Sequence, residues 1–208
     1  MNNTKGLLDR IAEGPVICAE GYLFELERRG YLSAGAYVPE VVLEHPEVVA
    51  QLHRDFIHAG SDVVEAFTYY AHREKLRQLG KEELLEQMNR AALQIAKEVA
   101  RETSTLLAGN ICNTNAYIEG DAESHKFVRT MFDEQVGWAV DAGVDFIIAE
   151  TIDFSGEAMI ALEAIKKTNL PAVVTLAIHR NGVTLDGMAP EDACKRLEDA
   201  GADVVGLN

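Results

Sequence analysis

Positive charge is scarce in this sequence, and long apolar runs are absent from it. Its 208 residues include 19 Lys and Arg against 34 Asp and Glu, for a formal net charge of −15. Nucleic acids and anionic membranes would repel such a chain, so we expect neither as a partner. No apolar run reaches the ~20 residues of a membrane span, and the N-terminus MNNTKGLLDRIAEG lacks the apolar core of a signal peptide. The cytoplasm is therefore the expected location.

Cysteine is also rare, and it forms no metal-binding or disulfide pattern. Cys18, Cys112 and Cys194 are widely spaced, odd in number and without a C-x-x-C pair. This pattern predicts neither a disulfide framework nor a ribbon-type zinc site. The six histidines likewise lack an i, i+4 pair of the kind that binds a metal from a helix. We expect three reduced thiols. Cys18 lies one residue inside the end of the first predicted strand, and Cys112 is the only thiol expected near the mouth of the fold.

One short pattern is repeated in the sequence. Asp141–Thr151 reads DAGVDFIIAET, and it has echoes at His58–Thr68 and Asp199–Asn208. Each copy places Gly after a helical pattern, then an acidic residue, then a short apolar run. Glycine just past a helix supplies the left-handed conformation that ends it, and a continuous apolar run is typical of a strand buried on both faces. The repeats predict helix-to-strand turns, and hence a parallel sheet built of βα units.

The rest of the chain continues this alternation. Six segments are predicted to be strands: Pro15–Ala19, Asp62–Thr68, Thr105–Asn110, Val144–Glu150, Ala172–Ile178 and Asp203–Asn208. Helical patterns lie between them, most clearly over residues 45–60 and 81–102. No low-complexity linker interrupts the series, so we expect one domain over residues 1–208.

Regular βα alternation is compatible with an open doubly wound sheet or with a closed barrel. No G-x-G-x-x-G loop and no P-loop occurs, which disfavours the open nucleotide-binding sheet. The sequence therefore favours an α/β fold of the (β/α)₈ TIM-barrel type. Because such a barrel has eight units, the six predicted strands indicate a barrel that is incomplete at the C-terminus of this chain.

In βα barrels the active site gathers at the carboxyl ends of the strands, where the βα loops converge. Polar and aromatic residues at the predicted strand ends are the candidates: Glu20, Tyr69, Tyr70, Asn110, Glu150, Thr151 and Asn208. Glu150 follows an almost unbroken apolar run, and a carboxylate there can bind an ammonium group or hold a proton at raised pKa. Tyr69 and Tyr70 can form an aromatic wall for a quaternary ammonium. Asn110 can orient a substrate carboxylate, although Asn is also a common turn residue.

Three segments together resemble the homocysteine S-methyltransferase family, and within it the betaine-dependent branch. They are residues 21–76 (GYLFELERRG through REKL), the AGVDFIIAET run, and DGMAPEDACKRLEDAGADVVGLN at residues 186–208. The resemblance implies a (β/α)₈ barrel in which zinc, held by three cysteines, activates the homocysteine thiol for attack on the methyl group of a betaine-like donor. A metal-bound thiol loses its proton at neutral pH, and the thiolate is the nucleophile. The product would be methionine.

The resemblance also assigns roles to residues of this sequence. Glu150 resembles the glutamate that binds the amino group of homocysteine, and Tyr69 and Tyr70 resemble the aromatic pair near the donor. Asn208 resembles the Asn directly before the first zinc cysteine, so the metal ligands would follow it. We therefore expect no zinc bound by these 208 residues alone and no methyl transfer from them, and we expect the complete protein to form a homo-oligomer.

Two residues depart from the family pattern. Ala19-Glu20-Gly21 stands where the family usually has Asp followed by Gly-Gly or Gly-Ala, and Thr151 stands where betaine-type enzymes tend to have Tyr. A one-residue shift at a strand end points a side chain in another direction. These departures leave open a related thiol methyltransferase with another donor or acceptor.

Two readings of a different kind remain open. One is a non-catalytic or auxiliary barrel that works by association, since an incomplete barrel has unpaired edge strands that invite pairing with a partner chain. The other is an unrelated barrel aldolase or decarboxylase with Glu150 as base. The absence of a lysine at any predicted strand end disfavours Schiff-base chemistry and hence this last reading.

Overall fold

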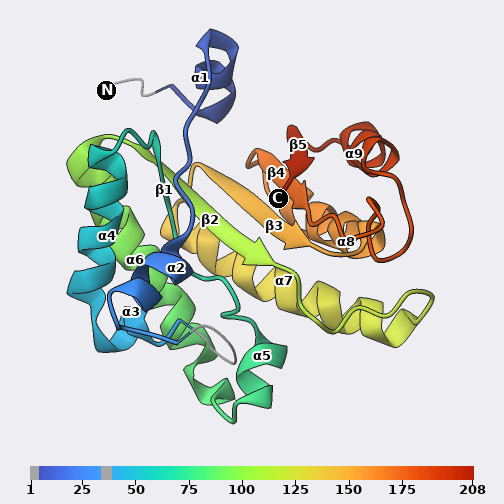
Figure 1. Ribbon diagram of the computed structural model, residues 1–208, viewed down its shortest axis with the longest axis horizontal. Coiled ribbons are helices and arrows are strands. Elements are labelled where there is room, and N and C mark those ends of the chain that lie inside the picture. The colour runs from blue at the N-terminus through green and yellow to red at the C-terminus, as the bar shows by residue number, and fades with distance from the viewer. Residues whose placement is uncertain (1–4, 34–38) are drawn as a thin grey trace.

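The computed structural model describes residues 5–33 and 39–208 and has an α/β architecture (Figure 1). Five parallel strands lie side by side in chain order: β1 (Val63–Glu65), β2 (Leu106–Cys112), β3 (Phe146–Ile152), β4 (Ala172–Leu176) and β5 (Val204–Leu207). The helices before and between them are α1 (Leu7–Glu13), α2 (Tyr22–Arg28), α3 (Val41–Glu44), α4 (Pro46–His58), α5 (Arg73–Gln78), the short η1 (Glu82–Leu84), α6 (Leu85–Thr103), α7 (Ala122–Ala142), α8 (Ser155–Lys166) and α9 (Pro190–Asp199). Sequential parallel order is what a βα barrel requires, so the predicted fold class is confirmed.

The outer face of the sheet packs against the long helices. Val64, Leu107, Ile147 and Val174 point outward from successive strands, and they share one buried cluster with apolar residues of α6, α7 and α8. Parallel strands covered by crossover helices are buried on both faces. This packing explains the near-continuous apolar runs of the sequence.

The inner face carries a second, smaller cluster. Its members alternate with the outward-facing residues along β1, β2 and β3, and Leu7 of α1 packs into the same cluster: Leu7, Val63, Leu106, Ala108, Phe146 and Ile148. Because side chains on a strand alternate between faces, the next inward positions are Glu65, Asn110 and Glu150. The apolar cluster of the inner face is therefore followed, at the carboxyl end of the sheet, by a layer of three polar side chains.

Strands β2 to β5 lie within about two residues of their predicted bounds, and β1 is shorter than the predicted Asp62–Thr68. Pro15–Ala19 does not form a regular strand. Only Cys18 pairs with Val63, as an isolated parallel bridge. The amide of Ile17 donates to the Asp62 carboxylate (2.9 Å) and that of Ala19 to the Ser61 hydroxyl (3.0 Å). The backbone amides of this segment therefore donate to side-chain oxygens and not to the backbone carbonyls of a neighbouring strand. The segment lies beside β1 without extending the sheet.

The repeated helix-to-strand turn is confirmed. Gly143 ends α7 with φ 77° and donates its amide to Ala139, while Gly60 and Gly201 in the two echoes also have positive φ. Part of the segment that carries the family resemblance, residues 34–38, lies outside the described residues. None of the helices in the described ranges combines the length and the apolar composition that crossing a bilayer requires.

The close contact between β2 and α7 generates a prediction about stability. A Cβ added at Gly109 of β2 would lie 2.9 Å from the Cβ of Ala139, whereas one added at the exposed Gly137 of α7 would meet nothing within 4 Å. We expect Gly109→Ala to lower the free energy of unfolding by about 1–3 kcal/mol, because the added methyl group overpacks a buried contact. Gly137→Ala is expected to raise it by about 0.5–1 kcal/mol, since Ala is the better helix former. Urea denaturation of both variants measures this. Equal effects of the two substitutions would contradict the packing described for β2 and α7.

Candidate functional site

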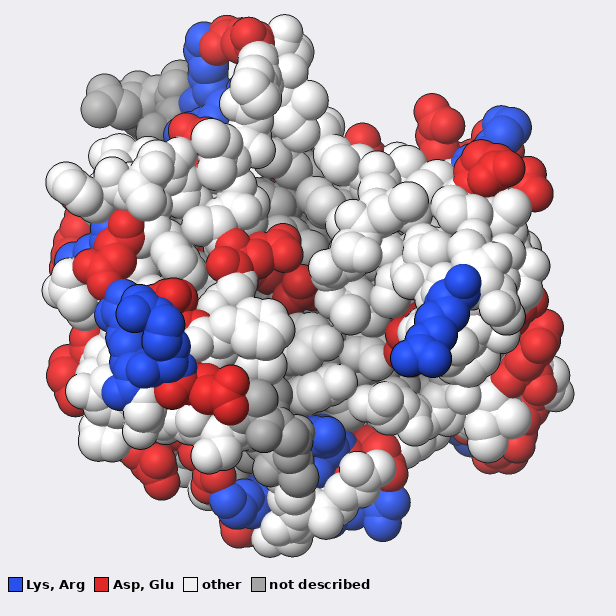
Figure 2. Space-filling model, in the orientation of Figure 1, with Lys and Arg blue, Asp and Glu red and all other residues white. Residues whose placement is uncertain are grey.

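A pocket of about 300 Å³ opens at the carboxyl ends of the strands. Its lining comes from the loop after Cys18, from α2, from the strand ends and from the last residue of the chain: Glu20, Gly21, Tyr22, Leu23, Phe24, Glu65, Ala66, Phe67, Tyr69, Asn110, Glu150, Thr151 and Asn208. Six of the seven candidate residues predicted from the sequence are among them, all but Tyr70. In the space-filling view, acidic atoms lie in the hollow at the centre of this face and no Lys or Arg atoms lie with them (Figure 2).

The centre of the site is a pair of buried carboxylates joined by one amide. The Nδ2 of Asn110 donates to Oε1 of Glu65 and to Oε1 of Glu150, each at 2.5 Å. All three side chains are at least 90% buried. The amide nitrogen of Asn110 therefore binds two carboxylates of the protein itself. The sequence had suggested that Asn110 orients a substrate carboxylate, and this geometry does not support that role.

Burial and mutual repulsion both disfavour charge on this pair. Burial, followed by the nearby carboxylate of Glu150, raises the pKa of Glu65 well above its usual value. Burial, followed by the charge of Glu20, raises the pKa of Glu150 to about 7, although the amides of Asn110 and Asn208 oppose the rise. Two carboxyl groups that share one amide ionise together only at a high cost. Near neutral pH the pair retains a proton.

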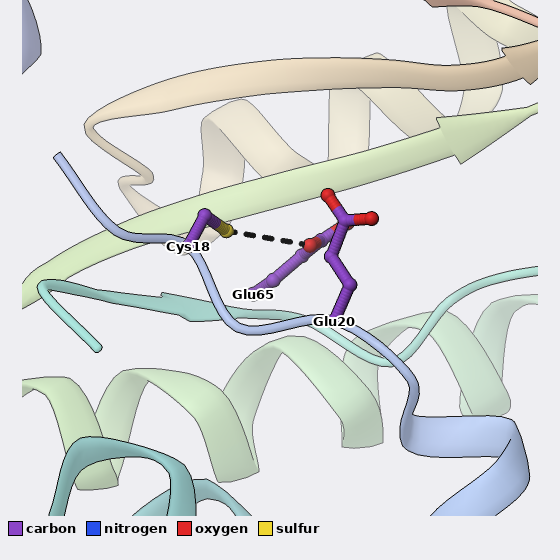
Figure 3. A group of neighbouring side chains, drawn as sticks. All are labelled: Cys18, Glu20 and Glu65. Carbon is purple, nitrogen blue, oxygen red and sulfur yellow. Dashed lines mark hydrogen bonds between the residues drawn. The ribbon is translucent and has the colours of Figure 1, made fainter. Parts of the chain in front are cut away.

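Two further side chains approach Glu65 from the segment before α2 (Figure 3). The Cys18 thiol donates to Oε2 of Glu65 at 3.6 Å, and Glu20 extends toward the same carboxylate from the exposed side. Burial and the charge of Glu65 raise the pKa of the Cys18 thiol, which therefore stays protonated. Cys18, Glu20 and Glu65 each offer one metal-ligating atom, all within 4.8 Å of one another. The sequence predicted only Cys112 near this edge, and Cys18 is the thiol that reaches it.

The end of β3 is strained where it meets the end of β5. Thr151 has φ 53°, a left-handed conformation that is costly for a β-branched residue, and the register of β3 with β4 shifts between Ala149 and Ile152. The Nδ2 of Asn208 donates to the Thr151 hydroxyl at 2.6 Å and to Glu150 at 3.5 Å. These contacts tie Asn208 to the carboxylate pair and fix the side of Glu150 that faces the pocket.

Three aromatic side chains that line the pocket form an aromatic wall, whose members differ in part from those predicted. Tyr69 lines the pocket with Tyr22 and Phe24 of α2. Tyr70 does not line it: its ring lies under the Lys75 ammonium, 4.4 Å from the centroid. The two tyrosines lie in a turn, their ring centroids are 4.5 Å apart, and Tyr70 has a left-handed φ of 63°. The strand-end pattern of the sequence did not predict this turn, and of the two rings only that of Tyr69 lines the pocket.

The sequence reasoning missed Glu65, Tyr22 and Phe24. Glu65 was hidden because it lies in the middle of a predicted strand, where only the ends were read as site positions. Glu65 could have been found because it lies two residues after Val63, which faces inward, so that Glu65 faces inward as well. The two aromatic residues belong to a short helix that the sequence pattern did not single out.

The thiols of the described chain do not form the three-cysteine site expected of the family. Cys112 is buried and accepts the backbone amide of Tyr70, Cys194 lies on α9, and Cys18 faces Glu65. The described residues therefore do not fit a zinc ion held by three cysteines.

The fold and the position of the pocket define a barrel protein with its site at the carboxyl ends of the strands. The sequence model of the family described as Homocysteine S-methyltransferase matches residues 17–208. The chain belongs to this family.

Several relatives extend the comparison. Betaine–homocysteine S-methyltransferase 1 of Xenopus tropicalis is 41% identical over 98% of this chain and 51% of its own length. The Bos taurus protein of that name is 41% identical over the whole chain and 51% of its own length, and the Sus scrofa protein is 40% identical over 98% of this chain and 74% of its own length. The chain spans about half the length of most of the curated relatives it matches.

A solved structure supports the fold. The metallated form of the homocysteine methyltransferase MmuM from Escherichia coli has a TM-score of 0.80 and is 20% identical, covering 97% of this chain and 77% of that one. Its oxidized form gives a TM-score of 0.79 at 20% identity, over 100% and 77% of the two chains. At this identity the likeness shows the barrel fold alone.

The raised pKa of Glu150 predicts a pH dependence of stability. In the unfolded chain its carboxyl releases its proton near the usual value of 4.5, whereas the folded chain releases it at about 7. The unfolded state therefore loses the proton first as pH rises, and the free energy of unfolding falls by about 3 kcal/mol between pH 4.5 and 7. Glu150→Gln removes this contribution, so its denaturation curves at pH 5 and pH 8 should lie closer together than those of the wild type. The exposed Glu83→Gln is the matched control. A wild-type pH dependence in Glu150→Gln would contradict the buried pair.

Proposed function

We propose that this chain forms the substrate-binding part of a homocysteine S-methyltransferase, which transfers a methyl group from a small onium donor to the thiol of homocysteine and yields methionine. The observation that carries the proposal is the place of Glu150. This residue resembles the family's glutamate for the amino group of homocysteine, and it lies buried in the pocket beside Asn110 and Asn208.

The chain's own residues support amino-acid binding in a defined orientation. An ammonium group that approaches Glu150 favours the ionised carboxylate, so the proton of the buried pair is displaced when the substrate binds. The side-chain amide of Asn208, which also donates to the Thr151 hydroxyl, donates to Oε2 of this carboxylate at 3.5 Å. The amino group is thereby fixed on the side of the pocket where β3 and β5 end.

The aromatic wall supports an onium donor. Tyr69, Tyr22 and Phe24 line the same pocket as the carboxylates, and the face of an aromatic ring attracts a quaternary ammonium by about 0.5–2 kcal/mol. A methyl group between this wall and the bound amino acid would have a short path to the thiol.

Zinc is proposed for the complete protein on the family resemblance alone. The described thiols do not converge on one point, so no step is assigned to a metal among them. We also propose a cytoplasmic location, which the three free cysteines support because reduced thiols are typical of that compartment. We further propose a homo-oligomeric state.

The proposal predicts that the protein, as its source makes it, consumes homocysteine thiol and forms methionine when an onium donor is supplied. Glu150→Gln should lower kcat/KM for homocysteine roughly 30-fold or more, because a charge-assisted hydrogen bond to the ammonium is lost. Glu83→Gln should leave kcat/KM unchanged. Thiol consumption and methionine formation are measured together, with betaine and with a sulfonium donor. The absence of methionine with every onium donor would refute the proposal and would favour the alternative of a non-catalytic barrel that works by association with a partner chain.

A further inference from the structure

A second pocket lies at the amino ends of the strands, at the opposite end of the sheet from the proposed substrate site. Its volume is about 420 Å³, and it lies among the segment around α1, the end of α6 and the turns that lead into β2 and β3. It shares no lining residue with the pocket of Glu150. Four of its lining residues are basic and one is acidic: Lys5, Arg10, Lys97, Arg101 and Asp145.

This gathering of basic residues is unusual for the chain. Positive charge is scarce in the sequence, and most Lys and Arg side chains form ion pairs with carboxylates. Lys5 pairs with Glu13. Among the described residues, however, no carboxylate forms an ion pair with Arg10, Lys97 or Arg101. Three cations without an acidic partner therefore line one pocket of a strongly acidic chain.

The hydrogen bonds that these cations make leave most of their donors available. Nε of Arg10 donates to the carbonyl of Lys5 at 3.2 Å, and Nζ of Lys97 donates to the carbonyl of Ala142 at 2.6 Å. The guanidinium of Arg101 has no hydrogen-bond partner within the part of the chain that the structure describes. Because an ammonium group has three N–H donors and a guanidinium five, the pocket can offer several charged donors to one ligand.

Two features add negative charge near the pocket, and the protein itself already satisfies much of it. The helices α6 and α7 end here, and the carboxyl end of a helix carries a partial negative charge. At the end of α6 the carbonyl of Ala100 accepts two backbone amides, and at the end of α7 the carbonyl of Ala142 accepts Lys97. The carboxylate of Asp145 accepts the amide of Leu107 at 2.8 Å. The unpaired cations therefore remain in excess.

We propose that Arg10, Lys97 and Arg101 form a binding site for a small phosphate-bearing anion. A phosphate group has several charged oxygens, which can accept from cations on different sides, and the guanidinium fork matches its geometry. The volume of the pocket suits a small ligand and not a macromolecule. The net charge of the chain does not prevent binding, because salt screens charges more than about 8 Å away and the nearby cations then dominate.

Such a ligand would connect parts of the chain that are distant in sequence. Arg10 belongs to α1, whereas Lys97 and Arg101 belong to α6 and Lys97 also contacts the end of α7. An anion bound between them stabilises the folded state, since the unfolded chain does not assemble the site. The inference is independent of the proposed methyl transfer, because the two pockets share no residue.

The probe is inorganic pyrophosphate, titrated by calorimetry into the protein as its source makes it, at constant pH and ionic strength. We expect saturable binding and a raised melting temperature, and we expect added sodium chloride to weaken the binding because it screens exposed charges. Arg101→Gln, which removes no hydrogen bond of the described chain, should raise the dissociation constant about threefold. The double variant Lys97→Gln/Arg101→Gln should raise it about tenfold.

Arg180→Gln is the matched control. Arg180 is also exposed and without an ion-pair partner among the described residues, but it lies outside this pocket. The control should bind pyrophosphate as the wild type does, and melting temperatures without ligand verify that each variant is folded. The absence of saturable binding would overturn the inference. So would an equal loss in Arg180→Gln, which would show an effect of net charge alone, or a heat of binding that persists unchanged in the double variant, which would place the ligand elsewhere.

Discussion

One amide between two buried carboxylates organises the site of this protein. Asn110 donates both hydrogens of its side-chain amide to Glu65 and Glu150 at 2.5 Å. The three residues come from adjacent strands, so the parallel register of β1, β2 and β3 is what brings them together. Because the pair is desolvated, its protonation near neutral pH depends on what else enters the pocket.

The fold supplies both the desolvation and the access that this arrangement needs. Below the pair, Leu7 of α1 and the inward apolar side chains of the strands exclude water. Above it lies the pocket, which the aromatic wall and Asn208 after β5 help to line. The strained Thr151 and its bond to Asn208 orient the exposed edge of Glu150. Strain of this kind persists only where the surrounding structure fixes it, and it is concentrated at functional positions.

The sequence predicted the barrel class and the site edge, because apolar runs and glycine turns follow directly from burial and backbone sterics. Glu150 was found because it follows an apolar run, whereas Glu65 was missed because it lies inside one. Tyr70 was assigned to the wall with Tyr69, because the sequence pattern did not predict the turn in which Tyr70 takes a left-handed φ of 63°. The failure of Pro15–Ala19 to extend the sheet depends on side-chain hydrogen bonds from Asp62 and Ser61, which no local pattern of apolar residues encodes.

The central claim is that the Glu65–Asn110–Glu150 group retains a proton near neutral pH. The most direct test is carbon-13 NMR of the protein labelled at the glutamate side-chain carboxyl, titrated from pH 4 to pH 9 without ligand. The account predicts a glutamate carboxyl that titrates near pH 7, in contrast to the exposed glutamates, and the loss of this titration in Glu150→Gln. Titration of every glutamate carboxyl below about pH 5.5 would contradict the account, because ordinary glutamates titrate near 4.3.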